Sequence, residues 1–304
     1  MSFKPMNEYK FDFVKSRKIY FIISSTIAVV GLVCILLFGL NYGVDFKSGT
    51  NLDISVSKGN VTNDQVNAIL EEAGYGDLTP SIGEERVSIR FEDAMNEDEL
   101  NTIIDGFEKV YGEGNISHEE NTVDAGVAKE LGKKAIIVVL LASLGIIIYV
   151  TIRFEWRFAL SAVIALIHDA FVVIAIFSIF RLEVSLTFIA AVLTIIGYSI
   201  NDTIVIFDRI RENLKKMKVK TTEDLSKVVN TSIWQTLSRS VNTALTVVIA
   251  ALALLIFGSE SIRLFSLAIL IGLISGGYSS IFVASQLWFD MKKGTLKKKT
   301  VTSE

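Results

Sequence analysis

The hydrophobic positions of this chain gather into six long runs, each bounded by polar or charged residues. A helix that crosses a bilayer needs about 20 mostly apolar residues, and every run is close to that length or exceeds it. The sequence therefore predicts an α-helical integral membrane protein with six transmembrane helices. We expect the spans at residues 19–40, 133–152, 157–180, 184–207, 240–257 and 262–290.

Residues 41–132, between the first two runs, have the composition of a soluble domain rich in Asp and Glu. Alternating apolar residues and helical spacing predict strands at 52–56, 87–91 and 116–123 and helices at 62–73 and 97–111. Thr62 and Gln65 have the spacing of a capping box at the start of the first helix. This order of elements predicts a small α+β, ferredoxin-like domain outside the membrane.

Lysine and arginine are concentrated in residues 1–18, 208–239 and 291–304. Cytoplasmic segments of membrane proteins carry such an excess. We therefore expect both ends of the chain in the cytoplasm and the acidic domain on the opposite side. Lys133 and Lys134 are an exception, because they fall at the external end of the second run.

Within the basic 208–239 segment, residues 222–235 have apolar side chains at helical spacing opposite Asp224 and Lys227. This pattern predicts an amphipathic helix that lies on the inner face of the membrane. The basic residues lack interleaved aromatic residues, so anionic lipid headgroups are a simpler partner than nucleic acid.

Composition limits the chemistry that this chain can carry. Hydrophobic residues make up 51% of it, and it contains one cysteine and two histidines. One cysteine cannot form a disulfide framework, and His118 and His168 are too few for a metal site. A phosphate-binding loop of the Gly-x-x-x-x-Gly-Lys type is absent from the sequence. We therefore expect no cofactor and no enzymatic activity, and the electrochemical gradient is the remaining energy source.

The fourth run contains an acidic residue, Asp202. It lies about six residues, or roughly 9 Å, inside the cytoplasmic end of the run. Burying a carboxylate at such a depth costs about 3 kcal/mol even on insertion scales, so a functional role is the leading hypothesis. Helical spacing puts Tyr198, Ser199, Asp202 and Val205 or Ile206 on one face. The alternative is an Asp that is paired within the bundle only to fix helix packing.

Other polar residues lie in the neighbouring runs. Arg239 is near the cytoplasmic side of its helix, as Asp202 is, so we expect the two to meet and helix movement to load and unload the carboxylate. For His168, a structural hydrogen bond is an equal alternative to proton transfer. The candidates for a polar relay are His168, Asp169, Asn201, Asn242 and Thr243. Small residues that indicate close helix contact in the sixth run are Gly272, Ser275, Gly276, Gly277 and Ser279.

Four segments of the chain resemble one known family. They are GVDFKSGT at 43–50, RFEWR at 153–157, IALIHD at 164–169 and GYSINDTIVIFDRIREN at 197–213. The resemblance is to the SecF family of bacterial protein-export membrane subunits, in the resistance-nodulation-division superfamily. It covers nearly the whole chain, and the family layout has six spans with one large first external loop.

The resemblance implies a protein translocase subunit of the bacterial inner, cytoplasmic membrane. With SecD, it would use the proton motive force to assist preprotein export through the Sec channel after ATP-driven translocation. The implied partners are SecD, the SecYEG channel with its SecA motor, preprotein substrates, and YajC and YidC as further candidates.

The same resemblance assigns Asp202 and Arg239 to a proton pathway. It also marks an external loop motif that consists of Gly43, Asp45, Phe46 and Gly49. At Ser48 this chain departs from the family, which usually has glycine there, so we expect a slightly stiffer loop.

Two other functions fit the same pattern. A half-transporter of the superfamily that exports a small lipophilic molecule would need a larger external domain to hold a drug pocket. A scaffold that only holds partner subunits together would not need Asp202, although buried polar groups can serve specificity alone. Nothing in the sequence resembles the SecD half, so we expect SecD to be a separate chain.

Overall fold

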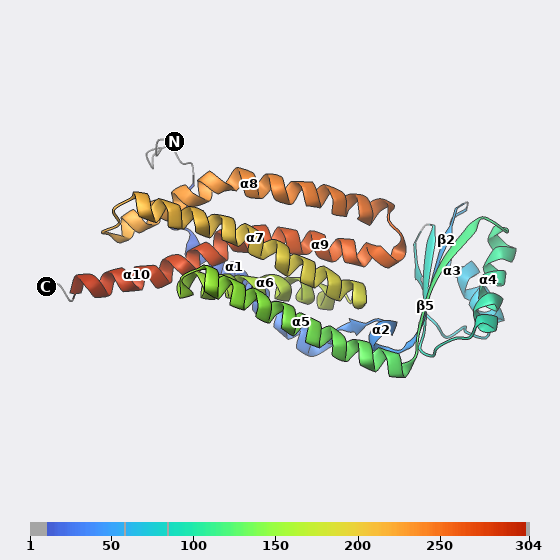
Figure 1. Cartoon of the computed structure of the whole chain (residues 1–304). Helices are drawn as coiled ribbons and strands as arrows, with labels where there is room; N and C mark the ends of the chain where they lie inside the picture. The colour runs from blue at the N-terminus through green and yellow to red at the C-terminus, as the bar shows by residue number, and fades with distance from the viewer. Residues whose placement is uncertain (1–10, 58, 84, 302–304) are drawn as a thin grey trace. The chain divides into compact units, whose positions relative to one another are not determined.

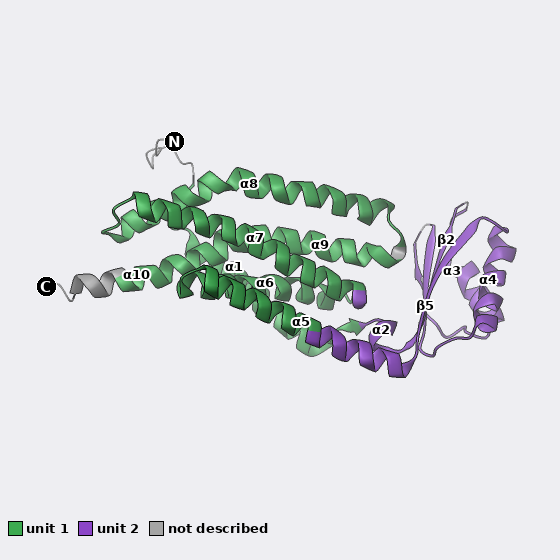
Figure 2. Cartoon of the chain, in the orientation of Figure 1, with its two compact units in different colours: residues 1–41, 138–182, 187–304 green, residues 42–137, 183–186 purple. Residues whose placement is uncertain are grey.

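The structure is a computed structural model in which the chain forms two compact units (Figures 1 and 2). The described residues are 11–57, 59–83 and 85–301. The first unit consists of residues 1–41, 138–182 and 187–304, and the second of residues 42–137 and 183–186. Part of the predicted N-terminal cytoplasmic segment, residues 1–10, lies outside the described residues.

The first unit is built from long helices. They are α1 (Arg17–Phe38), α5 (Ala125–Arg153), α6 (Trp156–Ile179), α7 (Leu186–Lys216), α8 (Thr222–Phe257), α9 (Glu260–Ser279) and α10 (Ser285–Val301), with a π-helical segment (Ser280–Ala284) between the last two. Residues 125–137 of α5 and Leu186 of α7 belong to the second unit. In the described part of the chain, six helical stretches are long and apolar enough to cross a membrane, the last running from α9 into α10. The predicted six transmembrane helices are confirmed.

These helices differ in how much of their surface the protein itself covers. In the apolar stretch of α6, 50% of the residues are buried inside the protein. The corresponding shares are only 11% in α1, 6% in α5 and 11% in α8. Large aromatic side chains fill the centre of the bundle, where Phe158 of α6 stacks on Trp288 of α10 at 4.6 Å between ring centroids. The exposed apolar faces fit a lipid environment, in which helices satisfy their own backbone groups.

Helices α7 and α9 approach each other through glycines. A Cβ atom on Gly272 would lie 2.3 Å from the side chain of Ile195, and one on Gly276 would lie 3.1 Å from Cβ of Ser199. The contact at Gly272 leaves no room for a side chain, and the one at Gly276 is tighter than most Cβ contacts. Gly272 and Gly276, which were expected to mark close helix contact, therefore do so.

The amphipathic segment 222–235 is not a separate helix on the membrane surface, as the sequence predicted. It is the first part of the continuous helix α8, and its apolar residues are fully buried within the protein. The chain before α1 lies against this part of α8: Asn230 Oδ1 accepts a hydrogen bond from the backbone N–H of Phe13 at 2.9 Å, and Phe13 packs edge-on against Trp234. An amphipathic face can be covered by lipid or by protein, and its periodicity does not distinguish the two.

The second unit contains a four-stranded antiparallel sheet covered by two helices. In chain order its elements are β2 (Gly49–Val56), α3 (Asn63–Glu72), β3 (Ser81–Ile82), β4 (Arg86–Phe91), α4 (Glu97–Tyr111) and β5 (Ile116–Val123). The strands lie in the order β3-β4-β2-β5, so β2 pairs with both β4 and β5. The first and third strands are thus central, which is the split βαβ arrangement of the predicted ferredoxin-like fold. Leu52, Ile89, Ile103 and Phe107 are fully buried in its core.

The predicted capping box at Thr62 is wrong in its geometry, although α3 begins next to it. The Thr62 hydroxyl donates to the Gln65 side chain at 2.9 Å, and it does not accept from the helix backbone. A capping box forms at α4 instead, between Asn96 and Glu99. Both segments have suitable residue types at the N-cap and N3 positions, so the residue pattern alone does not show whether the box forms.

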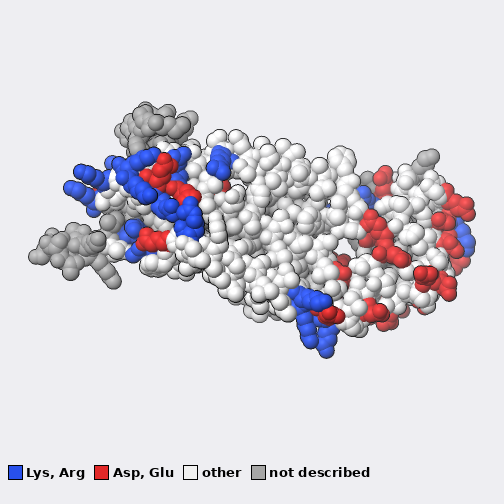
Figure 3. Space-filling view, in the orientation of Figure 1, with Lys and Arg blue, Asp and Glu red and all other residues white. Residues whose placement is uncertain are grey.

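Charged side chains are sorted within each unit (Figure 3). On the face shown, blue basic side chains gather at one end of the helical unit with some red acidic side chains among them, and a largely uncharged surface follows. The second unit shows mainly red Asp and Glu side chains. A broad uncharged band on the helical unit is what burial in hydrocarbon requires.

Candidate functional site

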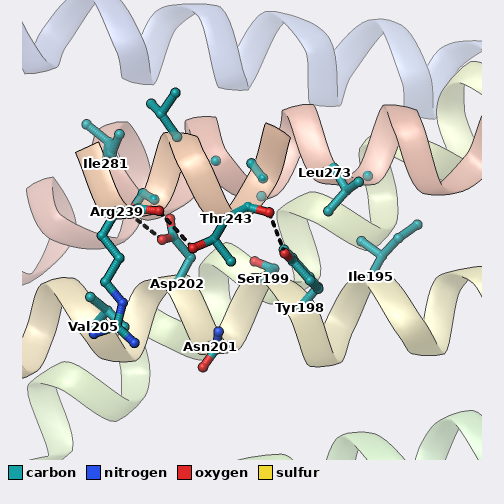
Figure 4. A pocket seen from close by; sticks show the side chains of 16 residues that line it. Ile195, Tyr198, Ser199, Asn201, Asp202, Val205, Arg239, Thr243, Leu273 and Ile281 are labelled. Atoms are coloured by element: carbon teal, nitrogen blue, oxygen red, sulfur yellow. Dashed lines mark hydrogen bonds between the residues drawn. The ribbon is translucent and has the colours of Figure 1, made fainter. Parts of the chain in front are cut away.

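Asp202 lines a cavity of about 170 Å³ between α7, α8 and α9 (Figure 4). Tyr198, Ser199 and Val205 line the same cavity, so the face predicted from helical spacing is confirmed, with Val205 rather than Ile206 facing the space. Gly272 and Gly276 form part of the opposite wall. The acid therefore faces an interior space between three helices.

Hydroxyl groups surround the Asp202 carboxylate. Ser240 of α8 donates a hydrogen bond to Oδ1, and the Ser280 side chain interacts with the carboxylate from the π-helical segment. Ser280 also shares a hydrogen bond of 2.8 Å with Thr203 of α7. The other carboxyl oxygen, Oδ2, has no hydrogen-bond partner among the described residues.

Arg239 lines the same cavity but forms no ion pair with Asp202 in the described part of the chain. Its side chain extends toward Val205, while Asp202 points toward α8 (Figure 4). Thr243 donates to the backbone oxygen of Arg239 at 2.8 Å, and its own backbone oxygen accepts from Tyr198 at 2.9 Å. Asp202 and Arg239 therefore line one cavity, as predicted from the sequence, but their side chains do not meet in it.

The remaining relay candidates divide into two groups. Asn201 lines the cavity and is exposed on α7, whereas Asn242 is exposed on α8 and is not part of the lining. His168 and Asp169 lie on α6, away from the cavity walls. Asp202, Arg239, Asn201 and Thr243 thus share a site, and Asn242 does not belong to it.

Asp169 is the centre of a second polar cluster. It is completely buried, and it accepts hydrogen bonds from Ser199 of α7 at 2.5 Å and from Ser275 and Ser279 of α9 at 2.7 and 2.6 Å. His168 Nδ1 lies 3.1 Å from the same carboxylate. Its polar partners come from α6, α7 and α9, so the carboxyl group of Asp169 joins three helices.

Sequence reasoning missed the roles of several serines. Ser275 and Ser279 were expected only as small residues, and Ser240 was not selected. The spacing of Ser275 and Ser279 was a usable signal, because residues four apart lie on one helix face. Their acceptor could not be identified, because it lies on a different helix.

The external loop motif is part of the second unit. Gly49 has a φ of +119°, and a Cβ there would lie 2.3 Å from the backbone oxygen of Phe91, so only glycine fits. Asp45 is buried and accepts two hydrogen bonds, while Phe46 packs edge-on against Tyr42 at 6.2 Å. Gly43 is in contact with Glu183. The motif residues therefore have distinct structural roles around one loop.

Comparison with known proteins agrees with this architecture. The family described as protein export membrane protein SecD/SecF, C-terminal, matches residues 105–294, and the SecD/SecF GG motif matches residues 35–59. The chain is 43% identical to the protein translocase subunit SecF of Alicyclobacillus acidocaldarius over 96% of both chains. It is 47% identical to the protein translocase subunit SecDF of Bacillus subtilis, over 95% of this chain and 39% of that protein.

A solved structure gives the same result. The crystal structure of SecDF, a translocon-associated membrane protein from Thermus thermophilus, superposes with a TM-score of 0.81 at 33% identity. It covers 95% of this chain, which spans 40% of that one. The chain belongs to the SecF branch of the SecD/SecF family of protein-export membrane proteins.

Proposed function

We propose that this chain is a bacterial protein translocase subunit that works with SecD and uses the proton motive force to assist export of preproteins. The observation that carries the proposal is Asp202, a carboxylate placed among membrane-spanning helices and facing a cavity that also contains Arg239. Intramembrane carboxylates of this kind mark ion pathways. The relatives named SecDF support SecD as the partner, since their name joins both subunits.

Exposed polar groups beside the cavity support a membrane partner. Asn201, Arg239 and Thr243 are exposed on spans of otherwise apolar surface. Polar side chains in a bilayer face protein or water rather than lipid, so a second subunit would cover them. We propose SecD for this place, and the SecYEG channel, the SecA motor, YajC and YidC as the wider assembly, with membrane lipid around it and no nucleic acid.

The orientation follows from charge. The basic end of the helical unit would lie in the cytoplasm with both termini, and the acidic unit would lie outside, in a bacterial cytoplasmic membrane. A proton that crosses such a membrane releases about 2.3 kcal/mol per 100 mV. This energy would act on preproteins after SecA has driven them into the channel.

The proposed cycle depends on the distance between Asp202 and Arg239. In the described arrangement Ser240 binds the carboxylate and Arg239 lies apart from it. A shift of α8 along α7 that brings the guanidinium to Asp202 would favour loss of its proton, and the reverse shift would favour uptake. The movement of α8 along α7 would then be coupled directly to loss and uptake of the Asp202 proton.

Asp169 extends the same polar network. Ser279, which binds Asp169, is adjacent to Ser280, which interacts with Asp202. Ser199 lies one helical turn before Asp202 on α7 and also binds Asp169. Hydroxyl groups can donate and accept, so we propose that Asp169 and its serines relay or anchor the proton site.

The test replaces Asp202 with asparagine, which keeps size and hydrogen bonding but cannot titrate. Asp202→Asn should assemble with SecD and lose the gradient-dependent part of preprotein export in reconstituted vesicles. Arg239→Lys keeps the charge without the planar fork, so it should weaken the gradient response. The matched control is Asp208→Asn on the same helix, which breaks surface ion pairs with Arg153 and Arg211 and should respond as the wild type does.

The outcomes separate the alternatives. A normal gradient response in Asp202→Asn would remove this residue from the mechanism. Loss of assembly together with export would favour the scaffold, because a structural Asp leaves its partners uncompensated when neutralised. Export of a lipophilic compound without preprotein would favour the half-transporter, against which the small external domain argues.

A further inference from the structure

The loop between β1 (Asn41–Tyr42) and β2 is fastened by the buried side chain of Asp45, which lies in the one-turn helix α2 (Val44–Lys47). Its Oδ2 accepts a hydrogen bond from the backbone N–H of Leu186 at 2.8 Å. Its Oδ1 accepts one from the side-chain amide of Asn121 at 3.1 Å. One carboxylate, 7% exposed, therefore joins the first residue of α7 to strand β5.

Neighbouring contacts hold the loop in this place. The N–H of Gly43 donates to the backbone oxygen of Val184 in β6 (Glu183–Val184) at 2.9 Å. The Glu183 carboxylate lies so close to Gly43 that a Cβ there would be 2.2 Å from Oε1. We call Gly43, Asp45, Asn121 and Glu183 the clasp, and all four belong to the second unit.

A helix cap alone does not require this arrangement. One acceptor at the start of a helix can come from an exposed Ser, Thr or Asn. Asp45 is buried, where an unpaired carboxylate oxygen is costly, and its second oxygen is bonded to a different element. The side chain is therefore a bridge between β5 and α7.

The element at the other end of the bridge carries the proton site. Helix α7 is continuous from Leu186 to Lys216, and Asp202 lies roughly 24 Å along it from Leu186. A continuous helix transmits a displacement of one end to the other. A fixed contact at Leu186 therefore acts on the helix that carries Asp202.

We propose that Asp45 is a positioning residue that couples strand β5 of the external domain to helix α7, so that movement of either element is passed to the other. Its consequence for export rests on the proposed function, whereas the bridge itself does not. Both hydrogen bonds are needed for this coupling, because with either one alone Asp45 no longer joins β5 to α7.

The experiment uses the full chain, reconstituted in vesicles with SecD and the channel. Two measurements are made on each variant: the ratio of preprotein export with and without a proton gradient, and hydrogen exchange of the backbone at the start of α7. The variants are Asp45→Ala, Asn121→Ala and the double variant. Asp45→Asn is the conservative variant, since after Asn121 turns its amide both hydrogen bonds can form again. Glu120→Ala, an exposed neighbour on β5, is the matched control.

We expect Asp45→Ala and Asn121→Ala each to lower the gradient-dependent export ratio, and the double variant to be no worse than Asp45→Ala. Exchange at the start of α7 should be about fivefold faster in Asp45→Ala, as for loss of a helix cap. It should also be faster in Asn121→Ala, although that residue does not touch α7. Asp45→Asn and Glu120→Ala should behave as the wild type in both measurements.

Two results would overturn the proposal. If Asn121→Ala matches the Glu120→Ala control while Asp45→Ala is impaired, Asp45 is only a helix cap. If Asp45→Asn is as impaired as Asp45→Ala, the hydrogen bonds are not the cause. A wild type without any gradient response would reject the proposed function instead, and the exchange measurement would still decide on the bridge.

Discussion

Ser48 has a backbone conformation that is almost confined to glycine. Its φ is 68° and its ψ is 168°, at the C-terminal end of α2. Side chains are strained in this region by about 1–3 kcal/mol. This chain thus keeps a serine at a position that favours glycine, at a cost in stability, which is a stronger effect than the stiffer loop expected from sequence.

Ser48→Gly should therefore stabilise the protein by about 1 kcal/mol, somewhat less than the strain because the unfolded chain gains freedom. Thermal unfolding of the purified protein in detergent measures this change. The control is Ser57→Gly, which is exposed and carries no positive φ, and it should not stabilise. An unchanged or lower melting temperature for Ser48→Gly would show that the strain is absent.

Glu183 makes stability depend on pH. Burial raises the pKa of its carboxyl, as do Asp53 and Asp45, while Arg90 acts in the opposite direction. A group whose pKa is raised on folding contributes stability that is full below its unfolded pKa of about 4.3 and is lost as pH rises through the folded value. Glu183 therefore favours the folded state in acid and disfavours it near neutral pH.

Glu183→Gln should melt at a higher temperature than the wild type at about pH 8, and the difference should shrink toward about pH 4. Melting in detergent across this range measures the effect. Glu119→Gln, on the exposed strand β5, provides a comparison in which burial does not contribute. A difference between Glu183→Gln and wild type that stays constant with pH would contradict the assignment.

At the scale of elements, the contact between α7 and α9 depends on the absence of side chains. Gly272→Val should destabilise the protein by about 1–3 kcal/mol, because its side chain would overlap Ile195. Gly277, on the same helix, has open space where a Cβ would be, so Gly277→Ala should be neutral or slightly stabilising. Thermal unfolding compares the two, and equal effects would mean that the contact is not tight.

The sequence predicted the structure best where the pattern of apolar residues within one helix or strand is sufficient to define the feature. The six spans, both helices of the external domain and the face of α7 that contains Asp202 follow from periodicity within single segments. The burial of the first part of α8 and the three serines around Asp169 could not be predicted in this way. Each depends on which other element of the fold packs against it. For the same reason, the sequence placed Arg239 near Asp202 but could not show that the two side chains point apart.

At the scale of the whole molecule, the second unit has a core of its own. Fourteen residues from β2, β4, α3, α4 and their connections form one buried cluster. The excised fragment 49–123 should therefore be a soluble monomer that melts cooperatively. Circular dichroism during heating tests this, with Ile103→Ala expected to cost about 2–5 kcal/mol. A fragment without a cooperative transition would show that the unit needs the rest of the chain.

The π-helical segment Ser280–Ala284 amounts to one residue inserted into a helix that would otherwise run straight from α9 into α10. Each residue of an α-helix turns the chain by about 100°, so everything after the insertion faces a different direction from the one that the spacing before it implies. Trp288 and Phe289, which follow the segment, are fully buried. Deleting one residue within this segment would therefore leave a regular α-helix with both rings still facing the bundle, whereas deleting one between the segment and Trp288 would turn both rings by about 100°.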